Sequence, residues 1–149
     1  MTTPTINYAG TVLINDKFQM LFVFTDGMWD FPCDMVKAGE SSKQSALRAV
    51  VEKTNVDPAN IRILKELPDI LEMEGNTIIK TKLYICEYET NPDYILRASF
   101  EGDGVFESKW FYMSALPVYS TSISNKYIIG FLYKFLSRTS ILSKLLPKS

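Results

Sequence analysis

The first 25 residues follow the pattern of a β-hairpin. Residues 6–15 and 18–25 are rich in β-branched and aromatic side chains, which favour extended structure. Between them, residues 15–17 are Asn-Asp-Lys. Asparagine and aspartate are typical of turns because their side chains hydrogen-bond to the nearby backbone. The pattern therefore predicts two antiparallel strands joined at residues 15–17.

A helical period begins after a loop over residues 26–40. Either Ser41 or Ser42 can cap the helix, because a serine hydroxyl accepts a hydrogen bond from a free backbone N–H. The helix is expected to end near Asn55, since asparagine tolerates a left-handed backbone and Pro58 prevents continuation. The side predicted to face the core comprises Ala46, Leu47, Val50 and Val51. The other side is expected to carry Arg48, Ala49, Glu52 and Lys53.

Extended structure is predicted again further along the chain. Residues 60–73 and 77–89 are mostly apolar or alternating, and the intervening Glu-Gly-Asn at residues 74–76 is typical of a hairpin turn. After a polar loop, residues 105–112 form a further predicted strand, followed by a short turn.

The last part of the chain differs from the rest in charge. Residues 1–116 hold all 17 acidic residues and 11 of the 16 basic ones, whereas residues 117–149 hold five basic residues and no acidic one. Apolar residues recur every three or four positions over 122–146 and predict a helix. Within a single domain of 149 residues, we expect residues 137–149 to form a basic amphipathic extension. It could bind nucleic acid, an anionic membrane surface or a protein partner, or the helix could simply pack on the core.

Composition excludes several kinds of chemistry. Histidine is absent, which removes Ser-His and Cys-His nucleophiles, imidazole zinc sites and a histidine base. Cys33 as a nucleophile therefore lacks a base to activate it. Neither a signal peptide nor an apolar stretch long enough to cross a bilayer is evident, so we expect an intracellular, cytoplasmic location.

One motif is more specific than any of these patterns. It begins Trp29-Asp30-Phe31-Pro32-Cys33-Asp34, continues with Gly39-Glu40 after four residues, and ends with Arg48-Ala49-Val50-Val51-Glu52-Lys53. Its spacing resembles the signature of the Nudix hydrolases, which cleave pyrophosphate bonds with Mg²⁺ held on a short helix. The resemblance extends over roughly residues 6–117. It implies an α/β/α sandwich, in which a mixed, curved sheet lies between the signature helix and a C-terminal helix.

The resemblance also locates the site residues. The family places three glutamates on one face of the helix around the metal, and here those positions are Ala49, Glu52 and Lys53. Local charge falls from about −3 to about zero, which weakens a metal site by orders of magnitude. A weak site for Mg²⁺ or Mn²⁺ would use Glu52 with Glu40, because magnesium needs few carboxylates when phosphates complete its shell. Alternative ligands or bases are Glu101, Asp103 and Glu107.

Arg48 and Lys53 each have two interpretations. Arg48 occupies, with Glu52, a catalytic position of the family, or it forms a plain helix ion pair with Glu52. Lys53 could hold a substrate phosphate as a point charge, or be a solvated surface lysine. Trp29 and Glu107 are candidate substrate-binding residues. Cys33 and Asp34 replace two loop glycines, and aspartate tolerates the left-handed backbone expected there.

Three functions are compatible with this sequence. The first is a catalytically impaired Nudix-like protein that binds a nucleotide or RNA phosphate, or serves as an interaction subunit. The second is an active Mg²⁺- or Mn²⁺-dependent pyrophosphohydrolase, acting on nucleoside diphosphates linked to another group, with a relocated base. The third is a structural component of a ribonucleoprotein assembly that uses the basic tail.

Overall fold

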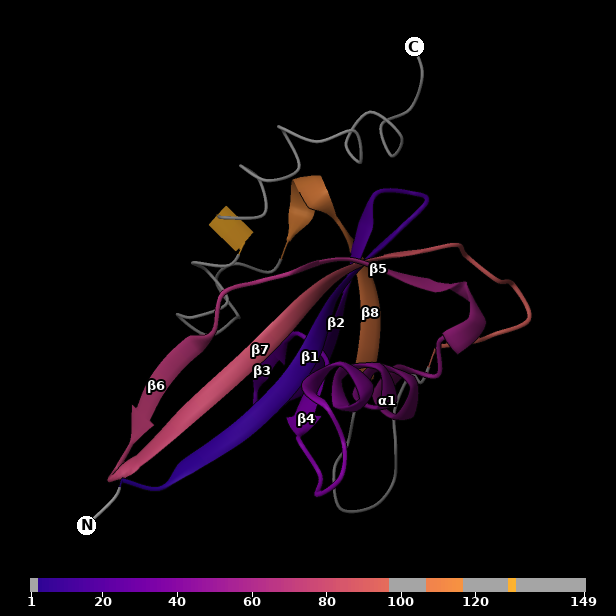
Figure 1. Ribbon diagram of the computed structural model, residues 1–149. Helices are drawn as coiled ribbons and strands as arrows, with labels where there is room; N and C mark the ends of the chain where they lie inside the picture. Colours follow the sequence, from indigo (N-terminus) through magenta and orange to yellow (C-terminus); the bar gives the residue numbers. More distant parts are fainter. Residues whose placement is uncertain (1–2, 97–106, 117–128, 131–149) are drawn as a thin grey trace.

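The fold is built around one mixed β-sheet (Figure 1). The computed structural model describes residues 3–96, 107–116 and 129–130. The sheet order is β3-β2-β1-β7-β5, while β4 pairs with β1, β6 with β7 and β8 with β2. The strands are β1 (Thr5–Asn15), β2 (Gln19–Thr25), β3 (Met28–Asp30), β4 (Cys33–Met35), β5 (Ile61–Glu66), β6 (Ile70–Glu74), β7 (Thr77–Tyr88) and β8 (Glu107–Tyr112). The helices are α1 (Ser42–Thr54) and the short 3₁₀ turns η1 (Pro58–Asn60) and η2 (Met113–Ala115).

The two longest strands, β1 and β7, run parallel at the centre of the sheet, from Thr5↔Ile78 to Asn15↔Tyr88. All other pairings are antiparallel. A parallel pair needs a long crossover connection, and here α1 lies within it. Both predicted hairpins are present, at residues 15–17 and 74–76. The predicted α/β fold with a mixed sheet is confirmed.

Local sequence signals fix both ends of α1. The Ser41 hydroxyl accepts the backbone N–H of Gln44, and the Gln44 side chain accepts the backbone N–H of Ser41. This reciprocal capping box satisfies two N–H groups that the helix itself leaves unbonded. At the other end Asn55 has a φ of 63° and its N–H bonds to the carbonyl of Val51. The predicted end at Asn55 is confirmed, and Ser41 is the cap.

The buried face of α1 differs from the prediction. Ala46 and Val50 face the core as expected, but Ala49 is also fully buried. The buried set is Ser45, Ala46, Ala49, Val50 and Thr54, whereas Leu47 and Val51 are half-buried. The helix turns its smaller side chains towards the sheet, because small side chains let the helix lie close to the strands. The placement of Ala49 on the solvent side beside Lys53 was therefore wrong.

The apolar run at residues 60–73 is not one strand. It is divided into η1, β5 and β6, with Leu67-Pro68-Asp69 between the two strands. Proline has no N–H to donate and so interrupts a ladder. The chain continues along the same edge of β7, pairing Ile61 with Tyr88 at one end and Glu74 with Thr77 at the other.

Apolar residues pack on both faces of the sheet. The α1-side core contains Ala9, Leu13, Leu21, Ala46, Val50, Val56, Tyr84, Cys86 and Tyr88. The opposite core contains Val12, Ile14, Met20, Phe22, Phe31, Leu67, Leu83, Ile85, Met113 and Ile129. Ile129 and Gly130 are helical, whereas the rest of the predicted helix at 122–146, including the extension at 137–149, lies outside the described residues. No helix in the described ranges is long and apolar enough to span a bilayer.

The loop expected at the two replaced glycines is a short strand. Cys33 and Asp34 belong to β4 and pair with Gly10 and Ala9, and neither has a positive φ. The predicted left-handed backbone at Asp34 was therefore wrong. The close approach is instead made possible by Gly10, where an added Cβ would lie 2.4 Å from the Cys33 Cβ and from the Pro32 carbonyl oxygen. The glycine needed for this contact is thus on the facing strand.

Candidate functional site

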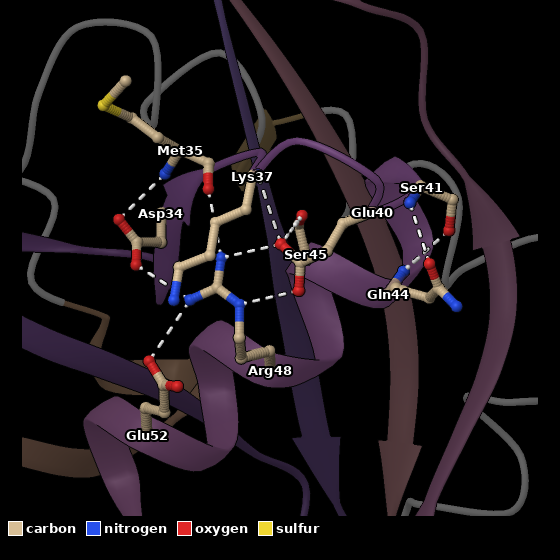
Figure 2. A network of polar contacts seen from close by, with 9 residues as sticks. All are labelled: Asp34, Met35, Lys37, Glu40, Ser41, Gln44, Ser45, Arg48 and Glu52. Atoms are coloured by element: carbon tan, nitrogen blue, oxygen red, sulfur yellow. Dashed lines mark hydrogen bonds and ion pairs between the residues drawn. The ribbon is translucent and has the colours of Figure 1, made fainter.

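Arg48 is the centre of a network that joins β4, the signature loop and α1 (Figure 2). Its Nε and Nη2 donate to the two carboxylate oxygens of Glu40 at 2.9 and 3.1 Å. Nη1 donates to Asp34 at 3.1 Å and to Glu52 at 3.2 Å, and Nη2 also donates to the Met35 carbonyl at 3.1 Å. These five bonds equal the number of N–H donors that a guanidinium has. Arg48 therefore holds three carboxylates with its full hydrogen-bonding capacity.

Glu40 is the most tightly held of the three acids. Besides Arg48, it accepts the Ser45 hydroxyl at 2.6 Å and the Lys37 backbone N–H at 3.2 Å. The preceding Gly39 has a φ of +83°, which brings the chain round so that Glu40 faces α1. Hydrogen bonds from Arg48 and then Ser45 lower the pKa of Glu40 from 4.5 to about 2. Both carboxylate oxygens of Glu40 are thus hydrogen-bonded to groups of the loop and of α1.

This shift predicts how stability depends on pH. Because the folded-state pKa of Glu40 lies below its ordinary value, its contribution is complete above about pH 4.5 and is lost as the pH falls towards about 2. Glu40→Gln should lower the melting temperature at about pH 7, and the gap to the wild type should close near pH 2. Thermal unfolding between about pH 7 and about pH 2 measures the difference in melting temperature. Glu74→Gln, at the exposed hairpin tip, is the control. A gap independent of pH would contradict the assignment.

Asp34 is the member of the network that sequence reasoning missed as a partner of Arg48. One of its carboxylate oxygens accepts Arg48 and the other accepts the Met35 N–H at 2.8 Å. Partial burial raises the pKa of Asp34, but the Arg48 and Met35 hydrogen bonds and the charge of Lys53 outweigh it and lower the pKa overall. No local spacing rule links residues 34 and 48, so only the folded chain reveals the pair.

Glu52 and Lys53 lie at the more open end of this network. The Glu52 side chain is 56% exposed, and Lys53 is close enough to Asp34 and Cys33 to lower the pKa of both. In the described part of the chain no group of three or more acidic or cysteine ligands is placed to hold a metal ion. A guanidinium and an ammonium stand among these carboxylates, and each positive charge opposes the binding of a divalent ion.

The surroundings of Cys33 do not favour its thiolate form. Burial raises the pKa of its thiol to about 11, although Lys53 opposes the shift. We expect iodoacetamide to modify Cys33 about a hundredfold more slowly than a free cysteine at pH 8, because so little thiolate is present. Lys53→Met should slow the reaction further by removing the favourable charge. Mass spectrometry measures the rate, with Cys33→Ser as control, and faster labelling in Lys53→Met would contradict the prediction.

Trp29 and Glu107 lie apart from the Arg48 network. Both pair with Phe24 of β2, from β3 and β8 respectively. Trp29 packs against the opposite core and makes an edge-to-face contact with Phe111, with ring centroids 4.9 Å apart. Asp34 and Arg48, by contrast, belong to the α1 side. The structure thus brings Arg48, Glu40, Glu52 and Lys53 together and sets Trp29 and Glu107 on the other face. Glu101 and Asp103 lie outside the described residues.

A separate cavity of about 490 Å³ lies where β5 begins and β7 ends. Its lining residues are Asp16, Ala59, Asn60, Ile61, Arg62, Glu87, Tyr88 and Glu89. Arg62 is paired with Glu87. None of the candidate site residues contributes to this cavity.

Comparison with known proteins agrees with the fold. The family model described as the NUDIX domain matches residues 5–129. The chain is a member of the Nudix family. No curated protein sequence matches it.

Solved Nudix structures are similar in fold. A C. elegans Ap4A hydrolase in a binary complex has a TM-score of 0.73 at 18% identity, covering 90% of this chain and 99% of that one. Another structure of C. elegans Ap4A hydrolase gives 0.69 at 18% identity, with coverages of 89% and 97%. A UDP-X diphosphatase gives 0.62 at 12% identity, with coverages of 91% and 65%. Identities this low show the fold alone.

Proposed function

We propose that this Nudix-family protein binds the phosphates of a nucleotide or of RNA, and that it hydrolyses them slowly or not at all. The observation that carries the proposal is that the carboxylates of the signature loop and helix are paired with positive charges. Asp34, Glu40 and Glu52 are all bonded to Arg48, and Lys53 stands where the family has a further glutamate. Members of the family generally use Mg²⁺ or Mn²⁺, but here Arg48 and Lys53 offset two of the three negative charges, which weakens the attraction for a divalent cation.

Lys53 is the residue proposed to contact phosphate. Its ammonium acts on Asp34 and Cys33, so it lies at the signature loop. An ammonium is a compact charge that binds phosphate without a fixed geometry. Arg48 is not assigned this role, because its donors are already engaged by three carboxylates and a carbonyl. Arg48 is instead a positioning residue that fixes Glu52.

A second candidate is an active metal-dependent pyrophosphohydrolase. Asp34 and Glu52 approach the same nitrogen of Arg48, at 3.1 and 3.2 Å, so two carboxylates converge next to the helix. The similar solved structures include an Ap4A hydrolase and a UDP-X diphosphatase. A role as an interaction subunit of a ribonucleoprotein, through residues 137–149, stays a prediction, since these residues lie outside the described ranges.

One set of measurements separates these functions. Wild type, Lys53→Met and Glu52→Gln are incubated with nucleoside triphosphates, dinucleoside polyphosphates and capped RNA, with Mg²⁺ or Mn²⁺. Binding is measured in parallel by calorimetry. The proposal predicts binding that Lys53→Met weakens about tenfold and turnover near background. Lys43→Met, the loss of an exposed lysine from the same helix, is the matched control. Turnover abolished by Glu52→Gln would establish the hydrolase instead.

A further inference from the structure

The outer edge of β6 has the properties of a peptide-docking strand. β6 and β7 form a hairpin at the border of the sheet, well away from α1 (Figure 1). Within residues 3–96, 107–116 and 129–130, β6 pairs with β7 alone. Edge strands are usually protected by lysine, proline or a bulge, because unpaired backbone groups attract other strands. The sequence of β6, Ile-Leu-Glu-Met-Glu, contains neither lysine nor proline, and its two charged residues are both acidic.

Two apolar side chains are exposed on this edge. Leu71 is 66% and Met73 64% exposed. They pair with Lys80 and Ile78 of β7, which lie on the same face of that strand as Tyr84 and Cys86 in the α1-side core. Leu71 and Met73 thus lie exposed on the α1-side face of the sheet, next to Ile78 and Lys80. Glu72 and Glu74 alternate with these residues and put negative charge on the other face.

The backbone of the same two residues is directed outward. The two-residue turn at Gly75 and Asn76 makes Glu74 and Thr77 a hydrogen-bonded pair. Such pairs alternate along an antiparallel ladder, so Glu74 and Glu72 bond towards β7. The N–H and C=O groups of Leu71 and Met73 therefore point away from β7. Among the described residues none bonds to these outward backbone groups, so exposed apolar side chains and available backbone groups coincide at these two positions.

We propose that β6 binds an extended peptide segment of a partner protein, in which apolar and basic residues alternate. The added strand would bond to the backbone of Leu71 and Met73, as in other cases of strand addition. Its apolar side chains would lie beside Leu71 and Met73 on the α1 side. Its lysines or arginines would face Glu72 and Glu74, because residues opposite each other on neighbouring strands share a face.

A second copy of this chain is a poorer occupant. In the register that pairs Leu71 with Met73 of the copy, Glu72 directly opposes Glu72 of the copy. In the register that pairs Met73 with itself, Glu72 opposes Glu74. The register that pairs Leu71 with itself avoids this, but it leaves Met73 opposite Asp69, outside β6, and so shortens the paired segment. Like charges directly opposite each other destabilise a strand pair. The charge pattern of β6 therefore favours a basic partner over self-association.

The test uses the full chain and a fluorescent peptide in which valine and lysine alternate. Fluorescence anisotropy should show binding that weakens about tenfold in Leu71→Ser/Met73→Ser, and that weakens and depends less on salt in Glu74→Gln. Ile95→Ser, a change at another exposed apolar residue (77% exposed), should leave binding unchanged. A peptide of the same composition with its lysines grouped should bind poorly, and so should one N-methylated on alternate residues.

Three outcomes would overturn the proposal. The first is no binding of the alternating peptide by the wild type. The second is equal binding of the grouped or N-methylated peptides, which would show charge attraction without strand addition. The third is a concentration-dependent dimer in sedimentation that Leu71→Ser/Met73→Ser abolishes, which would identify a second copy as the occupant. All substituted side chains are exposed, and circular dichroism checks that the variants stay folded.

Discussion

Lys53→Glu is expected to raise the affinity of the chain for Mn²⁺ at least tenfold. The change replaces a positive charge by a negative one beside Asp34 and Glu52, and a charge reversal close to a divalent ion has a large effect even at high effective dielectric. Calorimetry or the electron paramagnetic resonance signal of free Mn²⁺ measures the affinity directly. The same variant should bind inorganic pyrophosphate more weakly in the absence of metal.

The matched control for this prediction is Lys43→Glu. It makes the same charge change on an exposed residue in the first turn of α1, away from the Arg48 network. An equal gain in Mn²⁺ affinity in both variants would mean that total charge, and not the position of Lys53, is responsible. Adding Ala49→Glu is not expected to help, because Ala49 is fully buried. A carboxylate there would have to be desolvated under the helix.

Gly10→Ala is expected to lower the free energy of unfolding by roughly 3 kcal/mol, near the upper end for overpacking. The new Cβ would lie 2.4 Å from both the Cys33 Cβ and the Pro32 carbonyl oxygen, and neither backbone can move without disturbing the β1–β4 pairing. Urea denaturation measures the loss. Removing the Cys33 side chain as well, in Gly10→Ala/Cys33→Gly, should restore only part of the lost stability. The contact of the new Cβ with the Pro32 carbonyl oxygen remains.

Gly75→Ala provides the comparison for Gly10→Ala. Gly75 has a φ of +61° but nothing within 4 Å of an added Cβ, so only the backbone cost of about 1 kcal/mol applies. The two variants separate the cost of a steric clash between strands, at Gly10, from the cost of a left-handed backbone, at Gly75. Equal losses in the two would show that β1 and β4 separate easily, and that the tight contact at Gly10 is not important for stability.

Signals confined to a few neighbouring residues were sufficient for much of the fold. The caps of α1 at Ser41 and Asn55 follow from side chains that satisfy the helix ends. The turn at Gly75 follows from the backbone that a two-residue hairpin requires. Pro68 was available as a strand breaker and explains why residues 60–73 form two strands. These features depend on local chemistry, which the sequence contains directly.

The candidate site depended on contacts that sequence spacing does not contain. The motif located Arg48, Glu52 and Lys53 on one helix, but the burial of Ala49 depends on how α1 is rotated against the sheet. The bond between Asp34 and Arg48 joins a strand to a helix. The close approach of Gly10 to Cys33 joins strands that are distant in sequence. In each case the sequence pattern identifies the residue, but its contact partner is known only from the tertiary structure.

The parallel pairing of β1 with β7 has a consequence for synthesis of the chain. Asn15 pairs with Tyr88, which is synthesised 73 residues later. The N-terminal strand therefore leaves the ribosome long before the strand that covers its edge. Contacts between residues so far apart in sequence form slowly, because the intervening chain must first be closed into a loop. Until then, of the strands that the structure describes, β1 can pair with β2 and β4, and its other edge stays open to misfolding or to a chaperone.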